Sequence, residues 1–207
     1  MKRILLSILA NFIFLVHQPS AEVFFPLNSV GKLTCSVKDG MSTGTAFVIG
    51  EDRIATAAHV IHEMNWCVFG GLGTRLIYVD NERDLAVLEA DTNKRIPLAT
   101  SCKGVEETFY LTIGYADGSP AIQPLYGTNS YHDMRGDISF PFASRDLAYV
   151  RGEAFPGMSG GPVVDLKGRI VGVIVATDTP GVLVRDLRDS PLCTTVGRMK
   201  MGLSPLN

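Results

Sequence analysis

The sequence predicts an all-β protein built from closed antiparallel sheets. Short apolar or alternating runs rich in Val, Ile, Thr, Phe and Tyr recur along the chain, and turn signals such as Asp117-Gly118 and Lys167-Gly168 separate them. Sustained helical periodicity is almost absent. Since closure removes exposed strand edges, this many short strands without helical crossovers favours barrels, and the periodicity alone allows one barrel or two.

Length and composition restrict the kind of protein further. The 207 residues allow one domain or a tightly coupled pair, and a hydrophobic fraction of 46% with 19% charged residues excludes wholesale disorder. The formal net charge is only −2, and no basic run lies beyond the N-terminus. We therefore expect no nucleic-acid partner.

Residues 1–21 have the three parts of a secretory signal. Lys2 and Arg3 precede an apolar run, Ile4–Val16, and small residues follow at Ser20 and Ala21. The run is shorter than the ~20 residues that span a bilayer. We expect cleavage near Ala21, export to the periplasm or the extracellular space, and no membrane contact afterwards; the alternative is an uncleaved segment that tethers the protein.

The cysteine count fits an exported protein. An even number behind an export signal favours two disulfides, with the pairing open, and four buried free thiols are the alternative. No CxxC or His/Cys cluster supports a zinc site, and we expect neither a metal nor a cofactor. The four residues are Cys35, Cys67, Cys102 and Cys193.

The predicted strands form two groups. The first group comprises Leu33–Val37, Thr45–Ile49, Arg53–Thr56, Arg75–Val79 and Leu85–Glu89. The second comprises Thr108–Ile113, Ala121–Tyr126, Asp146–Arg151, Arg169–Ala176 and Gly181–Val184. The polar stretch Asn93–Glu107 is the natural linker between two barrels. We expect a signal at 1–21, a first barrel in 22–100, and a second barrel with a tail in 101–207. Helical signals are limited to Ala57–Met64 and a last helix around Arg185–Ser190.

Three segments carry chemistry. Ser159 lies among three glycines in FPGMSGGPVV, where a sharply bent backbone can expose a hydroxyl and aim successive N–H groups at one point. His59 lies in IATAAHV at the end of an apolar strand, where an imidazole can face a cleft and act as a general base. Asp84 opens the apolar run DLAVLEA, where a carboxylate needs a partner such as a histidine N–H.

Each segment also has a structural interpretation. The glycine-rich stretch reads equally well as a hairpin turn, a lone histidine is more often structural, and an aspartate can simply begin a strand. Asp80 and Asp91 are interpreted as such turn residues. His62 lacks the small-residue approach of His59, and His132 lies in a polar segment that we interpret as a surface loop.

The order His, Asp, Ser with these flanks resembles the chymotrypsin-like serine proteases, and in particular their bacterial HtrA/Deg-like branch. Gly44-Thr45-Ala46-Phe47-Val48, Arg83-Asp84-Leu85-Ala86-Val87 and Tyr110–Gly114 are similar to segments of that branch, and the resemblance covers about Thr43–Thr177. It implies two packed six-stranded barrels with the catalytic residues in the crevice between them. A peptide-binding PDZ module is not expected after the second barrel.

The resemblance assigns roles to individual residues. Ser159 would be the nucleophile, His59 the general base and then acid, and Asp84 the residue that orients the histidine. The N–H groups of Gly157 and Ser159 would form the oxyanion hole. Glu153 would lie at the base of the specificity pocket and favour a Lys or Arg side chain. The backbone of Ile174, Val175 and Ala176 would pair with an extended polypeptide substrate.

The chain departs from the family pattern at two places. Met158 stands where digestive members carry an aspartate that captures a freed N-terminus, so we expect a preformed site or one arranged by loop movement. No serine between Val173 and Ala176 is available to support Asp84. The function that we expect is an exported serine endopeptidase acting through an acyl-enzyme. The alternatives are a catalytically silent binding protein with the same barrels, or an esterase using the same triad.

Overall fold

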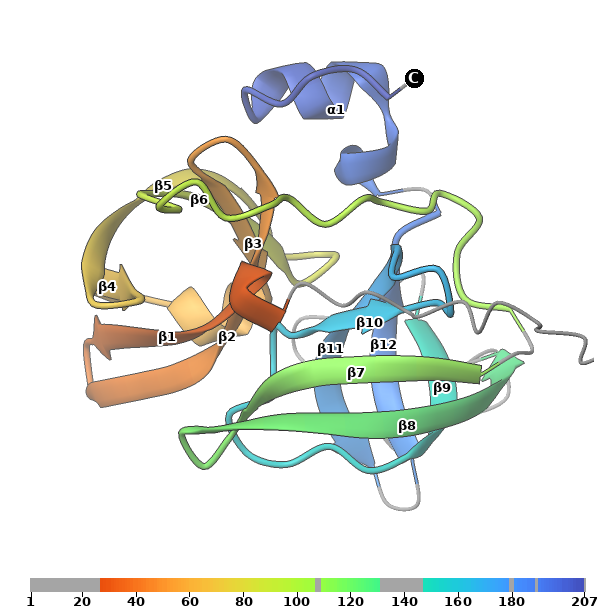
Figure 1. Cartoon of the computed structure of the whole chain (residues 1–207). Coiled ribbons are helices and arrows are strands. Elements are labelled where there is room, and N and C mark those ends of the chain that lie inside the picture. The colour runs from red at the N-terminus through yellow and green to blue at the C-terminus, as the bar shows by residue number, and fades with distance from the viewer. Residues whose placement is uncertain (1–26, 107–108, 131–146, 179–180, 189, 207) are drawn as a thin grey trace, which may run out of the picture.

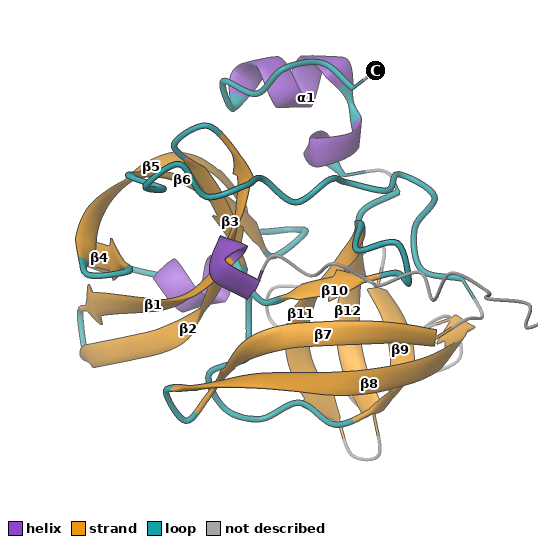
Figure 2. Cartoon of the chain, in the orientation of Figure 1, coloured by secondary structure: helices purple, strands orange, loops and turns teal. Residues whose placement is uncertain are grey.

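The computed structural model describes residues 27–106, 109–130, 147–178, 181–188 and 190–206. The expected signal segment and His132 therefore lie outside the described residues. The chain forms two closed antiparallel barrels of six strands each, which lie side by side (Figures 1 and 2). The prediction of an all-β fold with two six-stranded barrels is confirmed.

The first barrel is built from the strands β1 to β6, in the order β1-β2-β3-β6-β5-β4 around the barrel. Buried and more exposed residues alternate along much of β1, whereas consecutive residues are buried in β3, in β6 and in the second half of β2. These three neighbouring strands are therefore covered on both faces. The bounds are β1 Val30–Val37, β2 Gly40–Gly50, β3 Arg53–Thr56, β4 Met64–Phe69, β5 Leu72–Asp80 and β6 Leu85–Ala90.

The second barrel repeats this design with the order β10-β11-β12-β9-β8-β7. Its strands are β7 Phe109–Ala116, β8 Ser119–Ser130, β9 Leu147–Gly152, β10 Pro162–Val164, β11 Ile170–Asp178 and β12 Gly181–Asp186. The irregular connection that includes residues 93–106 joins the barrels and touches the second one through a bridge between Thr100 and Ile170.

Two strands escape the sequence patterns. In β4 an exposed tryptophan and asparagine weaken the alternation, and β10 has only three residues, so neither gives a readable run. The histidine turn is a short 3-10 helix, Ala58–Ile61. The prediction of a helix around Arg185–Ser190 is wrong, because Arg185 and Asp186 belong to β12, which pairs with β11 and β9.

The helix that does form lies further along the chain. It is α1, Thr195–Lys200, and the hydroxyl of Thr194 caps it by accepting a hydrogen bond from the N–H of Gly197 at 3.0 Å. No helix in the described ranges has both the length and the apolar character needed to cross a membrane.

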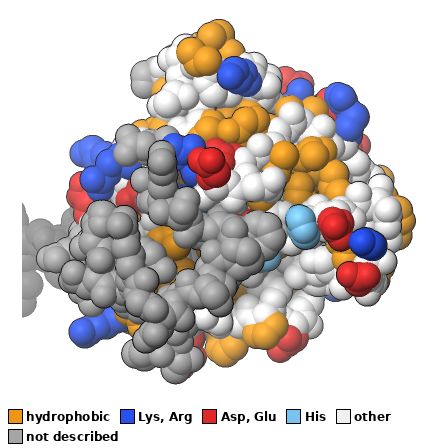
Figure 3. Space-filling model, turned by 180° about the vertical axis from the view of Figure 1, so that it is seen from behind, with side chains coloured by type: hydrophobic (Ala, Val, Ile, Leu, Met, Phe, Trp, Pro, Cys, Tyr) orange, Lys and Arg blue, Asp and Glu red, His pale blue; other side chains and the backbone are white. Residues whose placement is uncertain are grey.

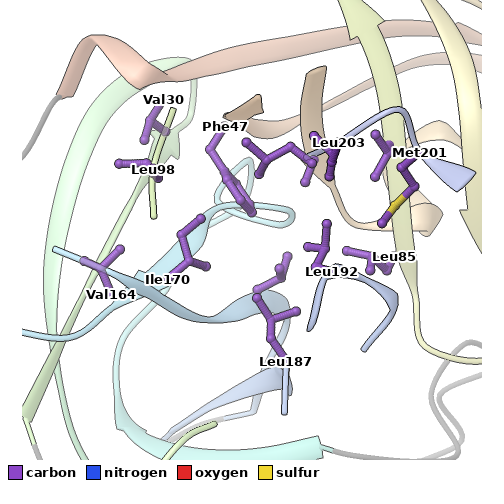
Figure 4. Close-up of a cluster of buried hydrophobic side chains, with 14 of the residues drawn as sticks. Val30, Phe47, Leu85, Leu98, Val164, Ile170, Leu187, Leu192, Met201 and Leu203 are labelled. Carbon is purple, nitrogen blue, oxygen red and sulfur yellow. The ribbon is translucent and has the colours of Figure 1, made fainter. Parts of the chain in front are cut away.

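One hydrophobic cluster joins the two barrels, the connection between them and the C-terminal segment (Figure 4). Phe47 and Leu85 come from the first barrel, Ile170 from the second, and Leu98 from the connection. The C-terminal segment adds a further group, namely Leu192, Met201 and Leu203. Because each of these side chains is at most 6% exposed, the relative position of the barrels is fixed by a shared core.

Both cysteine pairs form disulfides, so the prediction of two bridges is confirmed and the interpretation as free thiols is wrong. Cys35 on β1 pairs with Cys67 on β4, inside the first barrel. Cys102, in the connection between the barrels, pairs with Cys193, which precedes α1. The second bridge thus ties the C-terminal segment to the connection, across a sequence separation of 91 residues.

Candidate active site

His59 and Asp84 form a close pair at one end of the first barrel. The Nδ1 atom of His59 lies 2.7 Å from Oδ2 of Asp84, and the backbone N–H of His59 donates to Oδ1 of the same carboxylate at 2.7 Å. The side chain of Asp84 is fully buried, whereas that of His59 is 24% exposed. Because a carboxylate accepts at Nδ1, the proton lies there and Nε2 keeps its lone pair.

A short turn between β5 and β6 positions Asp84. Asp84 itself has φ 50°, and the backbone N–H of Arg83 donates to Oδ1 of Asp80 at 3.0 Å. Asp80 also accepts from Tyr78, whose pKa is raised by burial and by the charge and hydrogen bond of Asp80. Asp80 is therefore a turn residue, as the sequence suggested.

The second barrel supports this turn through Arg185. Arg185 is fully buried on β12, and its Nε donates to the backbone carbonyl of Arg83, directly before Asp84. Sequence reasoning missed this residue, although a cation inside the apolar run GVLVRD was the available signal. Within the described part of the chain no hydroxyl donates to Asp84, in agreement with the missing serine.

Ser159 packs against the strand that leads to His59. Its carbonyl accepts from the backbone N–H of Thr45 on β2 at 2.8 Å. A β-carbon on the next residue, Gly160, would lie only 2.2 Å from Oγ1 of Thr56 and 2.8 Å from the backbone nitrogen of Ala57. Gly160, at φ +81°, thus allows the loop to press against the segment just before His59. The structure thus pairs His59 with Asp84 and places the Ser159 loop against the segment just before His59.

The Ser159 loop leaves two amide groups without acceptors. In the described ranges the N–H groups of Gly157 and Ser159 donate no hydrogen bond. The intervening Met158 N–H donates to Phe155, and the N–H of Gly160 donates to Ile174. Two unpaired amides on one sharply bent loop are suited to bind a negatively charged oxygen. These are the two amides that the resemblance assigned to an oxyanion hole.

Met158 is fully buried beside β7. A β-carbon on Gly114 of that strand would lie 3.1 Å from both Cα and Cγ of Met158, so glycine gives the methionine its space. An apolar side chain therefore fills the place where an aspartate would need a cationic partner. The loop must be held by other contacts.

Part of the expected substrate edge of β11 is occupied by the loop itself. The N–H of Ile174 donates to Gly161 and its carbonyl accepts from Gly160, at 2.9 and 2.8 Å. Ile174 is therefore a support of the Ser159 loop, and its backbone is not free for a substrate. Val175 lies at a bulge relative to β12, and no described strand pairs with the other edge of Val175 and Ala176.

Glu153 follows the end of β9 and is exposed. In the described residues its carboxylate has no ion pair or hydrogen bond. The tip between β11 and β12, at residues 179–180, lies outside the description. The assignment of Glu153 to a specificity pocket thus stays a prediction.

Among the described residues on the face seen in Figure 3, side chains of both charges are present. Lys and Arg side chains alternate with Asp and Glu side chains, hydrophobic groups lie between them, and histidine atoms reach the solvent on this face. This mixture fits the small formal net charge of the chain.

Comparison with known proteins identifies the family. A family model for the trypsin-like peptidase domain matches residues 44–173, which include His59, Asp84 and Ser159. The chain belongs to the trypsin-like peptidase family. The serine protease Rv3671c of Mycobacterium tuberculosis is 30% identical over 141 residues, which are 63% of this chain and 35% of that protein. Serine protease HTRA1A of Danio rerio is 25% identical over 186 residues, 83% of this chain and 38% of that protein.

Solved trypsin-like structures share the fold. The active form of the Rv3671c protease superposes with a TM-score of 0.68 at 24% identity, over 88% of this chain and 85% of that chain. The HtrA-type protease AlgW with a tripeptide gives a TM-score of 0.69 at 19% identity, over 86% and 62% of the two chains. HtrA proteases are thus among the relatives and fold neighbours of this chain, in line with the resemblance. The chain spans little more than a third of the length of the curated relatives named above.

Proposed function

We propose that this chain is an exported serine endopeptidase that cleaves polypeptides through an acyl-enzyme. The observation that carries the proposal is the pair of hydrogen bonds between His59 and Asp84, together with a Ser159 loop in which the N–H groups of Gly157 and Ser159 have no described acceptor. Family membership supports the same reaction. The two disulfides support a site of action in an oxidising compartment.

The reaction follows from the proton positions. Oγ of Ser159 attacks the scissile carbonyl while Nε2 of His59 takes its proton, and buried Asp84 stabilises the imidazolium that forms. The N–H groups of Gly157 and Ser159 bind the resulting oxyanion. His59 then gives the proton to the leaving amine, and water releases the acyl group by the same route in reverse.

The substrate is proposed to bind as an extended strand. The edge of β11 at Val175 and Ala176, with which no described strand pairs, would supply the backbone N–H and C=O groups, and such pairing recognises main chain more than side chains. Solved structures of the related AlgW protease contain a tripeptide or a decapeptide, which supports a polypeptide as the substrate here.

The test of this function uses an activity-based fluorophosphonate probe. We expect the full-length wild-type chain to be labelled and to degrade a denatured polypeptide such as casein, and Ser159→Ala to do neither. Circular dichroism checks that the variant keeps the barrels. Failure of folded wild-type protein to react would point to a binding protein, and turnover of esters without turnover of peptides would point to an esterase.

Glu153 is proposed to favour Lys or Arg at the position before the cleaved bond. Its exposed carboxylate lies six residues before Ser159 and has no described partner that neutralises it. We expect Glu153→Gln to lower kcat/KM by about fivefold for Lys peptides and to leave Leu peptides unchanged, since one exposed ion pair contributes at most about 1 kcal/mol. Glu51→Gln, an exposed change in the first barrel, is the control. Equal preferences in the two variants would remove Glu153 from the pocket.

A further inference from the structure

Thr45 on β2 is a fully buried threonine whose polar atoms all contact other segments. Its backbone N–H donates to the carbonyl of Ser159, and its own carbonyl accepts from Oγ1 of Thr56 at 2.7 Å. Its hydroxyl accepts from the N–H of Tyr115 at 2.9 Å and lies 2.7 Å from the carbonyl oxygen of Gly157. One side chain of the first barrel thus connects β7 with the loop of the proposed oxyanion site.

The direction of the hydroxyl proton follows from these contacts. A hydroxyl has a single donor, and an N–H can only donate. The Tyr115 N–H therefore uses a lone pair of Oγ1, and the hydroxyl proton of Thr45 points to the carbonyl of Gly157. Both neighbours are backbone groups in the interior, where a missing partner is costly.

Gly157 needs hydrogen bonds from its surroundings because a glycine has no intrinsic preference for one sign of φ. It has φ +91°, and glycine adopts positive and negative φ about equally well. A β-carbon at this position would lie 2.3 Å from the carbonyl oxygen of Tyr115, so no other residue type fits. Contacts with the surroundings must therefore decide which way the Gly157 N–H points.

Two hydrogen bonds, one on each side of Gly157, make that selection. The carbonyl of Pro156 accepts from the N–H of Asp117 at 2.9 Å, so the N–H of Gly157, on the opposite side of the same trans peptide, points away from the β7–β8 turn. The Thr45 hydroxyl holds the following peptide through the Gly157 carbonyl. With both planes anchored, φ and ψ of Gly157 are fixed.

We propose that Thr45 is a positioning residue of the oxyanion site, which acts by holding the Gly157 carbonyl so that the Gly157 N–H stays available to the substrate oxygen. The inference rests on the proposed function and deepens it. Thr45 touches no reacting atom; it keeps a flexible glycine in the conformation that binds the transition state. Neutral hydrogen bonds from the first barrel thus take over the task that the buried Met158 cannot perform through an ion pair.

The test compares Thr45→Val with Thr45→Ser. Valine keeps the shape and removes the hydroxyl, whereas serine keeps the hydroxyl. We expect Thr45→Val to lower kcat by about 10- to 100-fold with an unchanged KM, because the site is then competent for only a fraction of the time. The affinity for a peptide aldehyde, whose adduct carries the oxyanion, should fall by the same factor. Thr45→Ser should stay within about threefold of wild type.

The matched control is Thr112→Val. Thr112 is equally buried, and its hydroxyl donates to the carbonyl of Pro162 at 3.2 Å, away from Gly157. We expect this variant to lose a similar hydrogen bond and to keep its kcat. A second measurement needs no substitution: in wild-type protein the Thr45 hydroxyl proton should be protected from exchange and should shift in the NMR spectrum when the aldehyde binds.

The outcomes separate the two proposals. Wild-type protein that hydrolyses no peptide overturns the proposed function itself. With an active wild type, the positioning role is refuted by full kcat in Thr45→Val, by equal losses in Thr45→Val and Thr112→Val, or by a raised KM at constant kcat. If Thr45→Val does not fold, the wild type decides. The positioning role is then refuted if the Thr45 hydroxyl proton exchanges rapidly with solvent and does not shift when the aldehyde binds.

Discussion

Replacing Asp84 by asparagine should leave both barrels folded and lower kcat by about 10⁴. The backbone N–H of His59 donates to Oδ1 of Asp84, and an asparagine oxygen can keep that bond. Its amide group must then face Nδ1 of His59, 2.7 Å away, and donate to it. The imidazole proton moves to Nε2, so the base that Ser159 needs is already protonated.

The measurement is steady-state hydrolysis of a peptide substrate, together with the unfolding midpoint in urea. Asp91→Asn is a matched control, because Asp91 is an exposed carboxylate of the same barrel that accepts from the N–H of Asn93 in a turn. This control should keep its kcat. Near-native activity of Asp84→Asn with an unchanged midpoint would mean that another carboxylate orients the histidine.

Removing the Cys102–Cys193 disulfide should have the largest effect on stability. The bridge closes a loop with a sequence separation of 91 residues, for which the chain-entropy account gives about 4.6 kcal/mol of the free energy of unfolding. The free energy of unfolding of the double variant Cys102→Ala/Cys193→Ala should fall by that amount, and its midpoint in urea should fall accordingly. An added protease should also cut the variant more readily in the segment that follows Leu187, because this segment loses its covalent link to the connection between the barrels.

The other disulfide provides the comparison. Cys35→Ala/Cys67→Ala breaks a bridge between paired strands of one barrel and leaves the C-terminal segment attached. It should lower stability without exposing that segment to a protease. If both double variants were cut at the same sites and the same rate, the anchoring role of Cys102–Cys193 would be refuted.

The sequence determines the fold class well because period-2 patterns are local. All ten predicted strands lie within or overlap strands of the structure, whereas β10 is too short to produce a pattern and exists only because β7 and β11 flank it. The last helix was misplaced because a short cationic stretch can be either strand or helix. Pairing of β12 with β9 and β11, which is a tertiary effect, decides for the strand.

The site residues also fall into two groups: those that the sequence reveals and those that only the structure reveals. His59, Asp84 and Ser159 stand in runs with recognisable flanks; the structure pairs the first two and packs the Ser159 loop against β2. Thr45 also stands in a recognisable run, but its proposed role, like that of Arg185, depends on a contact with a backbone carbonyl more than 100 positions away. A single sequence shows which residues are unusual for their surroundings, but not which distant backbone group they meet.

The division of the reactive groups between the barrels has a consequence for biosynthesis. A nascent chain that has completed only its first barrel holds the His59–Asp84 pair but no alcohol for it to activate. The serine arrives with the second half, and its loop is held both by β11 and by contacts with the first barrel. The proposed nucleophile and its proposed base are therefore combined only once both barrels have formed.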